Sequence, residues 1–300
     1  MAFKKFSSLM LLVCFVSHDL AAAEFKVAVR AHQGVENARQ MWQPSINVLN
    51  KAIPQHRFIL VPVVSLSEIT ERAGRGDFDF VLTNPSSFVE LEQRYEAKAL
   101  MTLNNKRANS AQSRFGSVIF THVRNKDILN INDLKGKKLM AVSALAFGGW
   151  RVAWLEMLEH GFNPADELEA LLFSQSKTQA EVVYAVRDGK ADAGVVRTDQ
   201  LERMEADAEI DMRYFRIINN KDEQSFPFFL STRLFPEWCF AAMKSVPDLL
   251  SQRVTTSLSL IKPDSSAAQQ GKYIGWIPAL DYTPVRDLMQ QLKVGSYASQ

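Results

Sequence analysis

The feature that most constrains this chain is a regular alternation of short apolar runs with stretches of helical periodicity, starting at Phe25. Short runs that are apolar at every or every second position are typical of strands, and apolar positions three or four residues apart are typical of helices. The first unit is predicted to hold strands at 25–29, 58–61 and 78–82 and helices at 41–53, 65–74 and 85–95. This order builds βαβ units, so we predict a largely parallel sheet covered by helices.

Two of these helices carry side-chain signals for their first turn. Ser65 with Glu68 three residues later predicts a capping box. Asn84 is a favourable N-cap, and Pro85 suits the first helical position that follows it.

After a polar stretch at residues 104–113 the alternation starts again. The second unit is predicted to hold strands at 115–122, 138–142, 170–173, 193–196 and 214–218 and helices at 148–160 and 178–188. We expect residues 236–292 to be helical, with breaks at Pro247, Pro263 and Pro278, and to pack back on the first unit. The prediction is an α/β protein with two lobes, each a mixed sheet flanked by helices. Lobe one is expected to comprise 24–112 and 221–300, and lobe two 113–220.

The first residues are predicted to be a cleaved signal peptide, residues 1–23. Lys4 and Lys5 precede a short apolar run, and three alanines end at Ala23. The run is too short to cross a membrane, so a soluble exported protein is expected. A lipoprotein would use Cys14, but Cys14 lies inside the run and follows Val13 instead of a small residue.

Charge and cysteine content limit the partners and the covalent bonds. Loss of Lys4, Lys5 and Asp19 with the signal would change the formal net charge from +2 to +1, which argues against a nucleic-acid partner. Cys14 would leave with the signal, so Cys239 would have no disulfide partner. An exported chain without a disulfide depends on its hydrophobic core.

The candidate binding residues follow strands, because ligands of open α/β sheets bind at the carboxyl ends of strands, where helix N-termini offer N–H groups. The predicted set is Arg30, Gly34, Thr83, Asn84, Ser143, Phe147, Gly148, Gly149, Arg197, Thr198 and Asp199. Backbone donors, hydroxyls and two arginines favour a small anion as the ligand.

Each group has a structural alternative. Asn84 can simply begin a helix, and Gly148 with Gly149 can form a tight turn. Thr198 or Asp199 can be a surface cap with Arg197 in solvent.

Catalytic and metal-binding motifs are absent from the sequence, so no enzyme, cofactor or metal is predicted. The sequence has no nucleophile elbow, zinc-protease helix, phosphate loop or C-x-x-C motif. Its histidines lack metal-ligand spacing. His32 lies in a candidate loop, where a solvated role is favoured over ligand contact. The competing hypothesis is an enzyme on the same fold, with Cys239 or a carboxylate acting on the bound solute. Residues 238–240 have the pattern of a buried helix face, which argues against the thiol.

An ordered set of short motifs spans nearly all of the chain after the signal. The set comprises Trp42, Pro44, Asp79, Phe80, Asn84, Pro85, Phe115, Gly116, Asp133 to Gly136, Phe147 to Trp150, Asp192 to Gly194, Arg197 to Glu202, Trp276, Pro278, Asp281, Tyr282 and Val285. With these motifs the sequence resembles the phosphonate-binding-like periplasmic proteins of type 2 fold. It is most similar to the branch that forms the sensor domain of tetrathionate-type histidine kinases.

The resemblance implies a periplasmic, two-lobed protein that binds a solute between its lobes without an enzymatic step. It implies a sulfur oxyanion such as tetrathionate or thiosulfate, or a phosphate or phosphonate if the chain serves an ABC transporter. Residues 144–149 depart from the hydroxyl-rich loop of phosphonate binders. Sensor proteins continue into a membrane helix and kinase, whereas this sequence ends at Gln300. We therefore expect a monomeric receptor whose closed form is recognised by a membrane permease or a sensor histidine kinase.

Overall fold

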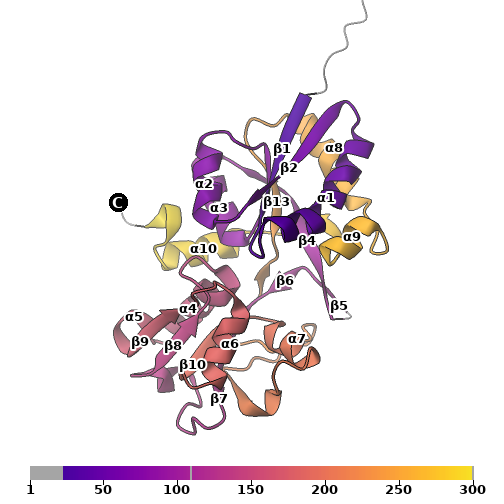
Figure 1. Ribbon diagram of the computed structural model, residues 1–300. Coiled ribbons are helices and arrows are strands. Elements are labelled where there is room, and N and C mark those ends of the chain that lie inside the picture. Colours follow the sequence, from indigo (N-terminus) through magenta and orange to yellow (C-terminus); the bar gives the residue numbers. More distant parts are fainter. Residues whose placement is uncertain (1–22, 109, 299–300) are drawn as a thin grey trace, which may run out of the picture.

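The computed structural model describes residues 23–108 and 110–298, which form two lobes (Figure 1). The predicted signal peptide lies outside the described residues, apart from Ala23. No helix within the described residues is long and apolar enough to cross a membrane.

Lobe one is built on a seven-stranded sheet with the order β14-β4-β13-β3-β1-β2 and with β5 paired to β4. Its strands are β1 (Ala23–Arg30), β2 (His56–Val63), β3 (Phe80–Thr83), β4 (Lys98–Arg107), β5 (Ser110–Gln112), β13 (Cys239–Ala242) and β14 (Tyr273–Pro278). Strand β1 pairs in parallel with β2 and β3, whereas β13 runs antiparallel to β3 and β4.

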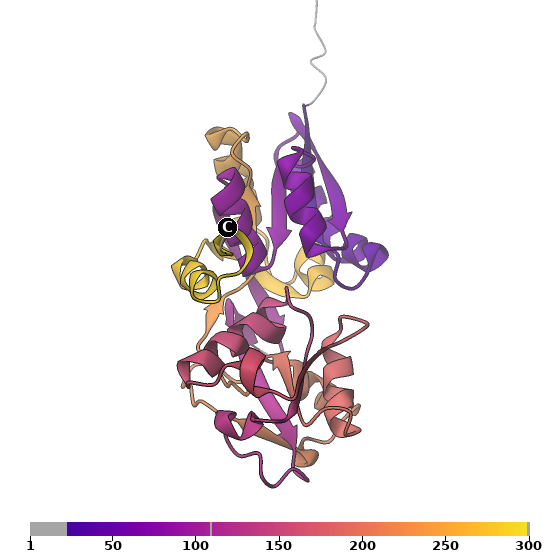
Figure 2. The same cartoon turned by 90° about the vertical axis from the view of Figure 1, so that its left-hand side faces the viewer.

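Helices cover both faces of this sheet (Figure 2). They are α1 (Val35–Ala52), α2 (Leu66–Gly74), α3 (Pro85–Tyr95), α8 (Asp248–Ser259), α9 (Ser266–Gly271) and α10 (Thr283–Gln291). One apolar cluster lies beneath α1, α8 and α9, and a second lies beneath α2, α3 and α10. All four residues of β3 are buried, as expected for a strand covered on both faces.

Lobe two is built on a five-stranded sheet with the order β11-β7-β10-β8-β9. Its strands are β7 (Ser117–His122), β8 (Lys138–Ala141), β9 (Ala170–Phe173), β10 (Ala193–Arg197) and β11 (Phe215–Ile218). Its helices are α4 (Val152–Glu159), α5 (Pro164–Glu167), α6 (Gln179–Arg187) and α7 (Gln200–Ala206). A π-helical turn, Phe147–Arg151, leads into α4.

The chain crosses between the lobes twice, and the two crossings pair with each other. Strand β6 (Arg114–Phe115) and strand β12 (Phe235–Pro236) form a short antiparallel ladder between the lobes (Figure 1). The structure thus has the predicted α/β architecture with helix-flanked mixed sheets. The lobe boundaries at 112/113 and 220/221 stay a prediction.

The expectation that residues 236–292 are helical is correct for α8, α9 and α10 and wrong for the rest of the segment. Two strands, β13 and β14, lie within this segment, and residues 238–240 do not form a helix face. A short apolar run has no periodicity that separates strand from helix. Here β13 lies between β3 and β4 with all four residues buried, so tertiary pairing decided its conformation.

One of the two predicted helix caps is present. The side chain of Asn84 accepts a hydrogen bond from the Ser87 N–H at 2.9 Å, and Pro85 is the first residue of α3. Ser65 makes no side-chain cap bond to α2, because its hydroxyl pairs with that of Ser67 at 2.6 Å. The capping box predicted for Ser65 and Glu68 is therefore not formed.

Candidate functional site

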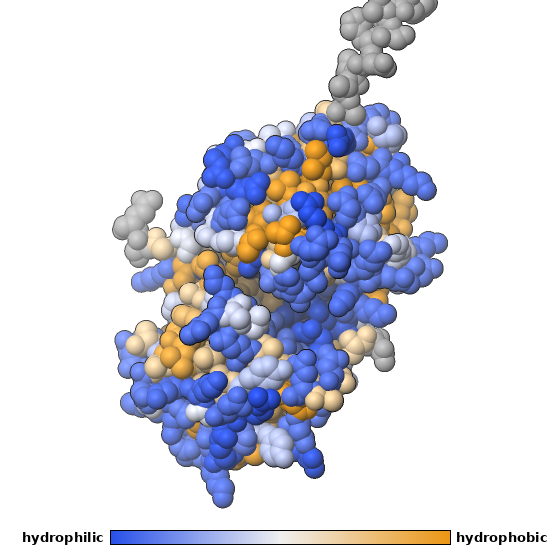
Figure 3. Space-filling model, in the orientation of Figure 1, coloured by the Kyte–Doolittle hydropathy of each residue, from blue (hydrophilic) through white to orange (hydrophobic). Residues whose placement is uncertain are grey.

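The carboxyl ends of strands from both lobes face the space between the lobes. Arg30 ends β1, Arg107 ends β4 and Arg197 ends β10. Strand β4 runs antiparallel to β13, which runs antiparallel to β3, so β4 ends at the same edge as β3. The molecular surface is hollowed between the lobes, with hydrophilic residues around the hollow (Figure 3). The sheet topology therefore places ligand-binding loops here.

Five charged residues gather at this place, and we call them the interlobe charge cluster. They are Arg107, Arg197, Asp199, Arg203 and Glu237. The Asp199 carboxylate lies 3.5 Å from Arg107 Nε, 3.7 Å from Arg197 Nε and 3.1 Å from Arg203 Nε. Arg107 belongs to lobe one and the other two arginines belong to lobe two, so Asp199 joins the lobes electrostatically.

Glu237 is fully buried beside the second crossing and pairs with Arg197. It also accepts hydrogen bonds from Asn105 Nδ2 at 2.5 Å and from the Trp238 N–H at 3.0 Å. Burial by itself would raise the pKa of Glu237, but the guanidinium groups of Arg197 and Arg107 outweigh it and lower that pKa. Burial would likewise lower the pKa of Arg197, but the Glu237 and Asp199 carboxylates raise it. Both groups are charged at neutral pH.

Arg107 was missed by the sequence analysis because residues 104–113 were interpreted as a polar link. The link is instead the end of β4 and the short strand β5, which form a hairpin. Burial, followed by the charge of Arg197, lowers the pKa of Arg107 to about 10, so its guanidinium stays protonated at neutral pH. The signal that could have found Arg107 is a strand pattern that continues from Lys98 into the polar stretch.

Arg30 and His32 lie in the loop between β1 and α1. The Arg30 guanidinium donates to the backbone carbonyl of Val64. The His32 ring meets the Trp238 ring edge to face, with 5.5 Å between centroids. His32 is solvent-exposed. Burial, and then the charges of Arg30, Arg107 and Arg197, lower its pKa to about 4.

The remaining predicted residues of lobe one lie at two loop positions. Gly34 has φ 95°, a backbone conformation that favours glycine, and is exposed at the start of α1. Thr83 is fully buried at the end of β3. Asn84 is buried and caps α3, so its side-chain oxygen is already engaged.

In lobe two, several of the predicted binding residues pack against other side chains of the same chain. Phe147 is buried against the rings of Phe115 and Phe235, and Gly149 packs against Val142. Gly148 has no room for a side chain, because a Cβ there would lie 2.6 Å from the Phe115 ring. Ser143 is half-buried in the same loop.

The loop after β10 is held by short contacts. Thr198 is buried, and its hydroxyl accepts from the Gly116 N–H at 3.3 Å. The Arg197 guanidinium lies over the Phe115 ring, 4.1 Å from its centroid. Asp199 precedes α7 without a side-chain cap bond, so the structural alternative in which its carboxylate caps this helix does not hold.

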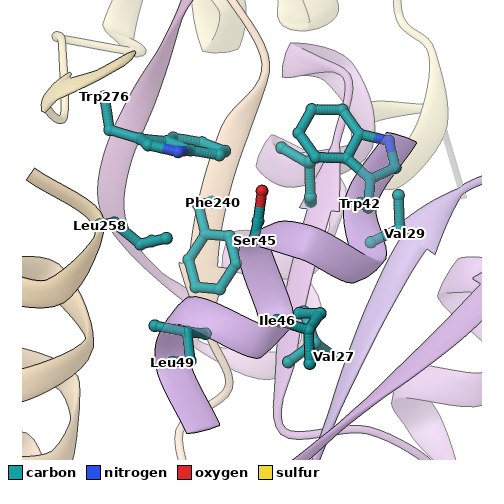
Figure 4. Close-up of a pocket in the computed structure, with 10 residues that line it drawn as sticks. Val27, Val29, Trp42, Ser45, Ile46, Leu49, Phe240, Leu258 and Trp276 are labelled. Carbon is teal, nitrogen blue, oxygen red and sulfur yellow. The ribbon is translucent and has the colours of Figure 1, made fainter. Parts of the chain in front are cut away.

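An enclosed cavity in lobe one is too small for a solute. The cavity beneath α1 has a volume of about 10 Å³ and is lined by apolar side chains such as those of Trp42, Phe240 and Trp276 (Figure 4). That is at most the room of one water molecule. Cys239 is fully buried, and burial raises the pKa of its thiol, which disfavours a nucleophilic thiolate. Among the described residues, no group of three His, Cys, Asp or Glu is arranged to hold a metal ion.

Two lobes with a charged cleft at the strand ends define a solute-binding architecture, and comparison with known families agrees. Residues 27–283 match the model of the periplasmic substrate-binding protein of phosphonate ABC transporters. The chain belongs to this family of periplasmic binding proteins.

A curated relative is the tetrathionate sensor histidine kinase TtrS of Salmonella typhimurium. It is 31% identical over 247 residues, which cover 82% of this chain and 41% of the kinase. The chain thus matches about two fifths of the length of that relative.

Solved structures share the fold at low sequence identity. PhnD1 from Prochlorococcus marinus, in complex with methylphosphonate, has a TM-score of 0.69 and 13% identity, with 91% of this chain and 99% of that chain covered. XAC2383 from Xanthomonas citri, bound to ATP, has a TM-score of 0.70 and 18% identity, with 91% of this chain and 96% of that chain covered. These likenesses confirm the two-lobed periplasmic-binding-protein fold.

Proposed function

We propose that this protein binds a small oxyanion between its lobes and presents it, by closure, to a membrane sensor kinase or transporter. We favour a sulfur oxyanion such as tetrathionate or thiosulfate. The observation that carries the proposal is the excess of positive charge in the cleft. Arg30 and the three arginines of the interlobe charge cluster outnumber the carboxylates of Asp199 and Glu237 by four to two.

The cleft arginines are suited to this task because guanidinium groups form charge-assisted hydrogen bonds to oxyanions. They also come from both lobes, so an anion that contacts Arg107 and Arg203 together favours the closed arrangement over the open one. A ligand shifts such an equilibrium by its differential affinity for the two states.

The choice of a sulfur oxyanion rests on two observations. The curated relative is a sensor of tetrathionate, and its matched segment covers most of this chain. The loop from Ala144 to Gly149 offers no side-chain hydroxyl to a phosphonate.

Calorimetry against tetrathionate, thiosulfate, sulfate, phosphate and methylphosphonate tests the proposal. We expect thiosulfate or tetrathionate to bind most tightly, and raised salt to weaken binding. The absence of binding across all five anions would refute an oxyanion receptor.

The second candidate ligand is a phosphate or phosphonate delivered to an ABC transporter. It is supported by the family match and by the methylphosphonate complex of PhnD1. Tighter binding of methylphosphonate than of both sulfur oxyanions in the same titrations would favour it.

A further inference from the structure

We propose that Asp199 is an internal competitor, whose carboxylate contends with the bound oxyanion for the arginines of the interlobe charge cluster. The inference rests on the proposed function and adds to it a residue that sets anion affinity. The sequence predicts that Asp199 contacts the ligand and so supports binding. The structure assigns it the opposite effect, which is to weaken anion binding.

The contacts of Asp199 are close but poorly directed. Its carboxylate is 2% exposed and lies 3.1–3.7 Å from three guanidinium nitrogens. Within the described residues, neither carboxylate oxygen accepts a hydrogen bond of normal geometry, and the Nε groups of Arg107 and Arg197 also find no acceptor. The carboxylate therefore neutralises the arginines without saturating their donors.

The start of helix α7 does not explain why an aspartate is present at position 199. Asp199 has φ 72° and ψ −8°, a left-handed conformation that glycine and asparagine adopt more readily than most residues. Its side chain makes no cap bond to α7. A strained position that holds a buried charge points to a functional constraint.

The arginines that Asp199 contacts retain accessible surface. The side chain of Arg107 is 23% exposed and that of Arg203 is 45% exposed. A solute oxyanion can reach these two groups while Arg197 stays paired with buried Glu237. Asp199 and the oxyanion would then be two like charges on the same guanidinium groups, and like charges within a few ångströms repel.

The experiment compares the full chain with Asp199→Asn and Asp199→Gly. Both variants remove the charge and suit the left-handed backbone, so both should fold, which thermal unfolding would verify. We expect the dissociation constant for thiosulfate, measured by calorimetry, to fall at least tenfold in both variants. The gain should shrink at high salt.

Asp211→Asn is the matched control. It removes one half-buried carboxylate from the surface of lobe two, where Asp211 pairs with exposed Arg213. Its affinity should stay within twofold of the parent chain.

Unchanged or weaker thiosulfate binding in a folded Asp199→Asn protein would overturn the inference, because Asp199 would then position the arginines or contact the ligand. In that case the parent chain still binds an anion, and the proposed function stands. If neither the parent nor the variants bind thiosulfate, tetrathionate, sulfate, phosphate or methylphosphonate, both proposals fail. Binding in the variants alone supports the competitor role.

Discussion

Arg30 and Arg197 occupy equivalent positions at the ends of parallel strands, yet their surroundings differ. Arg197 is enclosed by the carboxylates of Glu237 and Asp199, whereas Arg30 donates to a backbone carbonyl at the rim of the cleft. Position at a strand end brings a guanidinium to the cleft, but neighbouring carboxylates decide how much of its charge is available. The loop after β1 therefore presents a guanidinium group that is available to a ligand. The guanidinium group of the loop after β10 is largely neutralised by carboxylates of the protein itself.

The largest expected effect is a difference in the free energy of unfolding between a variant near Arg197 and a variant near Arg30. Glu237→Gln leaves Arg197 as a buried guanidinium without its main counter-ion, so the free energy of unfolding should fall by about 3–5 kcal/mol. The matched variant is Glu36→Gln, in the exposed first turn of α1, the helix that follows Arg30 in the chain. It should change the free energy of unfolding by less than about 0.5 kcal/mol. Urea unfolding of both variants measures the difference. Equal losses would show that the pairing of Arg197 is not what distinguishes the loops.

The next effect concerns affinity. Arg30→Ala removes a guanidinium that forms no ion pair with a carboxylate in the described part of the chain, so oxyanion binding should weaken by about 1.5–3 kcal/mol with little loss of stability. Arg197→Ala should weaken binding and also destabilise the fold, because it leaves Glu237 buried and unpaired. Calorimetry combined with thermal unfolding separates the two cases. A stable Arg197→Ala protein would contradict the comparison.

A smaller effect tests the role of Asn84 in lobe one. Loss of its hydrogen bond from the Ser87 N–H in Asn84→Ala should cost about 1 kcal/mol of stability, the usual value of an N-cap. Asn84→Ser restores a capping oxygen and should recover most of the loss in urea unfolding. If the serine variant regains stability but loses anion affinity, Asn84 also contacts the ligand.

The smallest effect is a pH dependence from His32. Its pKa of about 4 in the folded protein is below the ordinary value of about 6.5, so the unfolded chain takes up a proton first as pH falls. This contribution to stability is complete above pH 6.5 and is lost between pH 6.5 and 4. His32→Gln should therefore lose less stability than the parent between pH 7 and 4.5, because glutamine does not titrate.

Urea midpoints at the two pH values measure this effect. His160→Gln, exposed at the end of α4, controls for the loss of a histidine elsewhere. An unchanged acid sensitivity in His32→Gln would place His32 away from the arginines.

Much of the fold could be predicted from local patterns. Alternating and apolar runs located β1 to β3 and β7 to β11, and Asn84 with Pro85 marked the start of α3. These signals are local, because side-chain periodicity follows directly from backbone geometry. The strand β13 had no such signal, since its four buried residues fit a helix equally well.

The site was only partly predictable. Sequence position identified Arg30 and Arg197 as strand-end residues, but it could not show that Glu237, forty residues after Arg197, neutralises Arg197. Nor could it place Arg107 beside Asp199, because that contact depends on how β4 pairs within the other lobe.

The sequence alone determined the alternation of elements, the α/β class and the loops that face the cleft, because these depend on residues close together in the chain. The tertiary structure decided which charges meet between the lobes. Ion pairing depends on distance in space and on burial, and both arise only when segments far apart in the chain pack together.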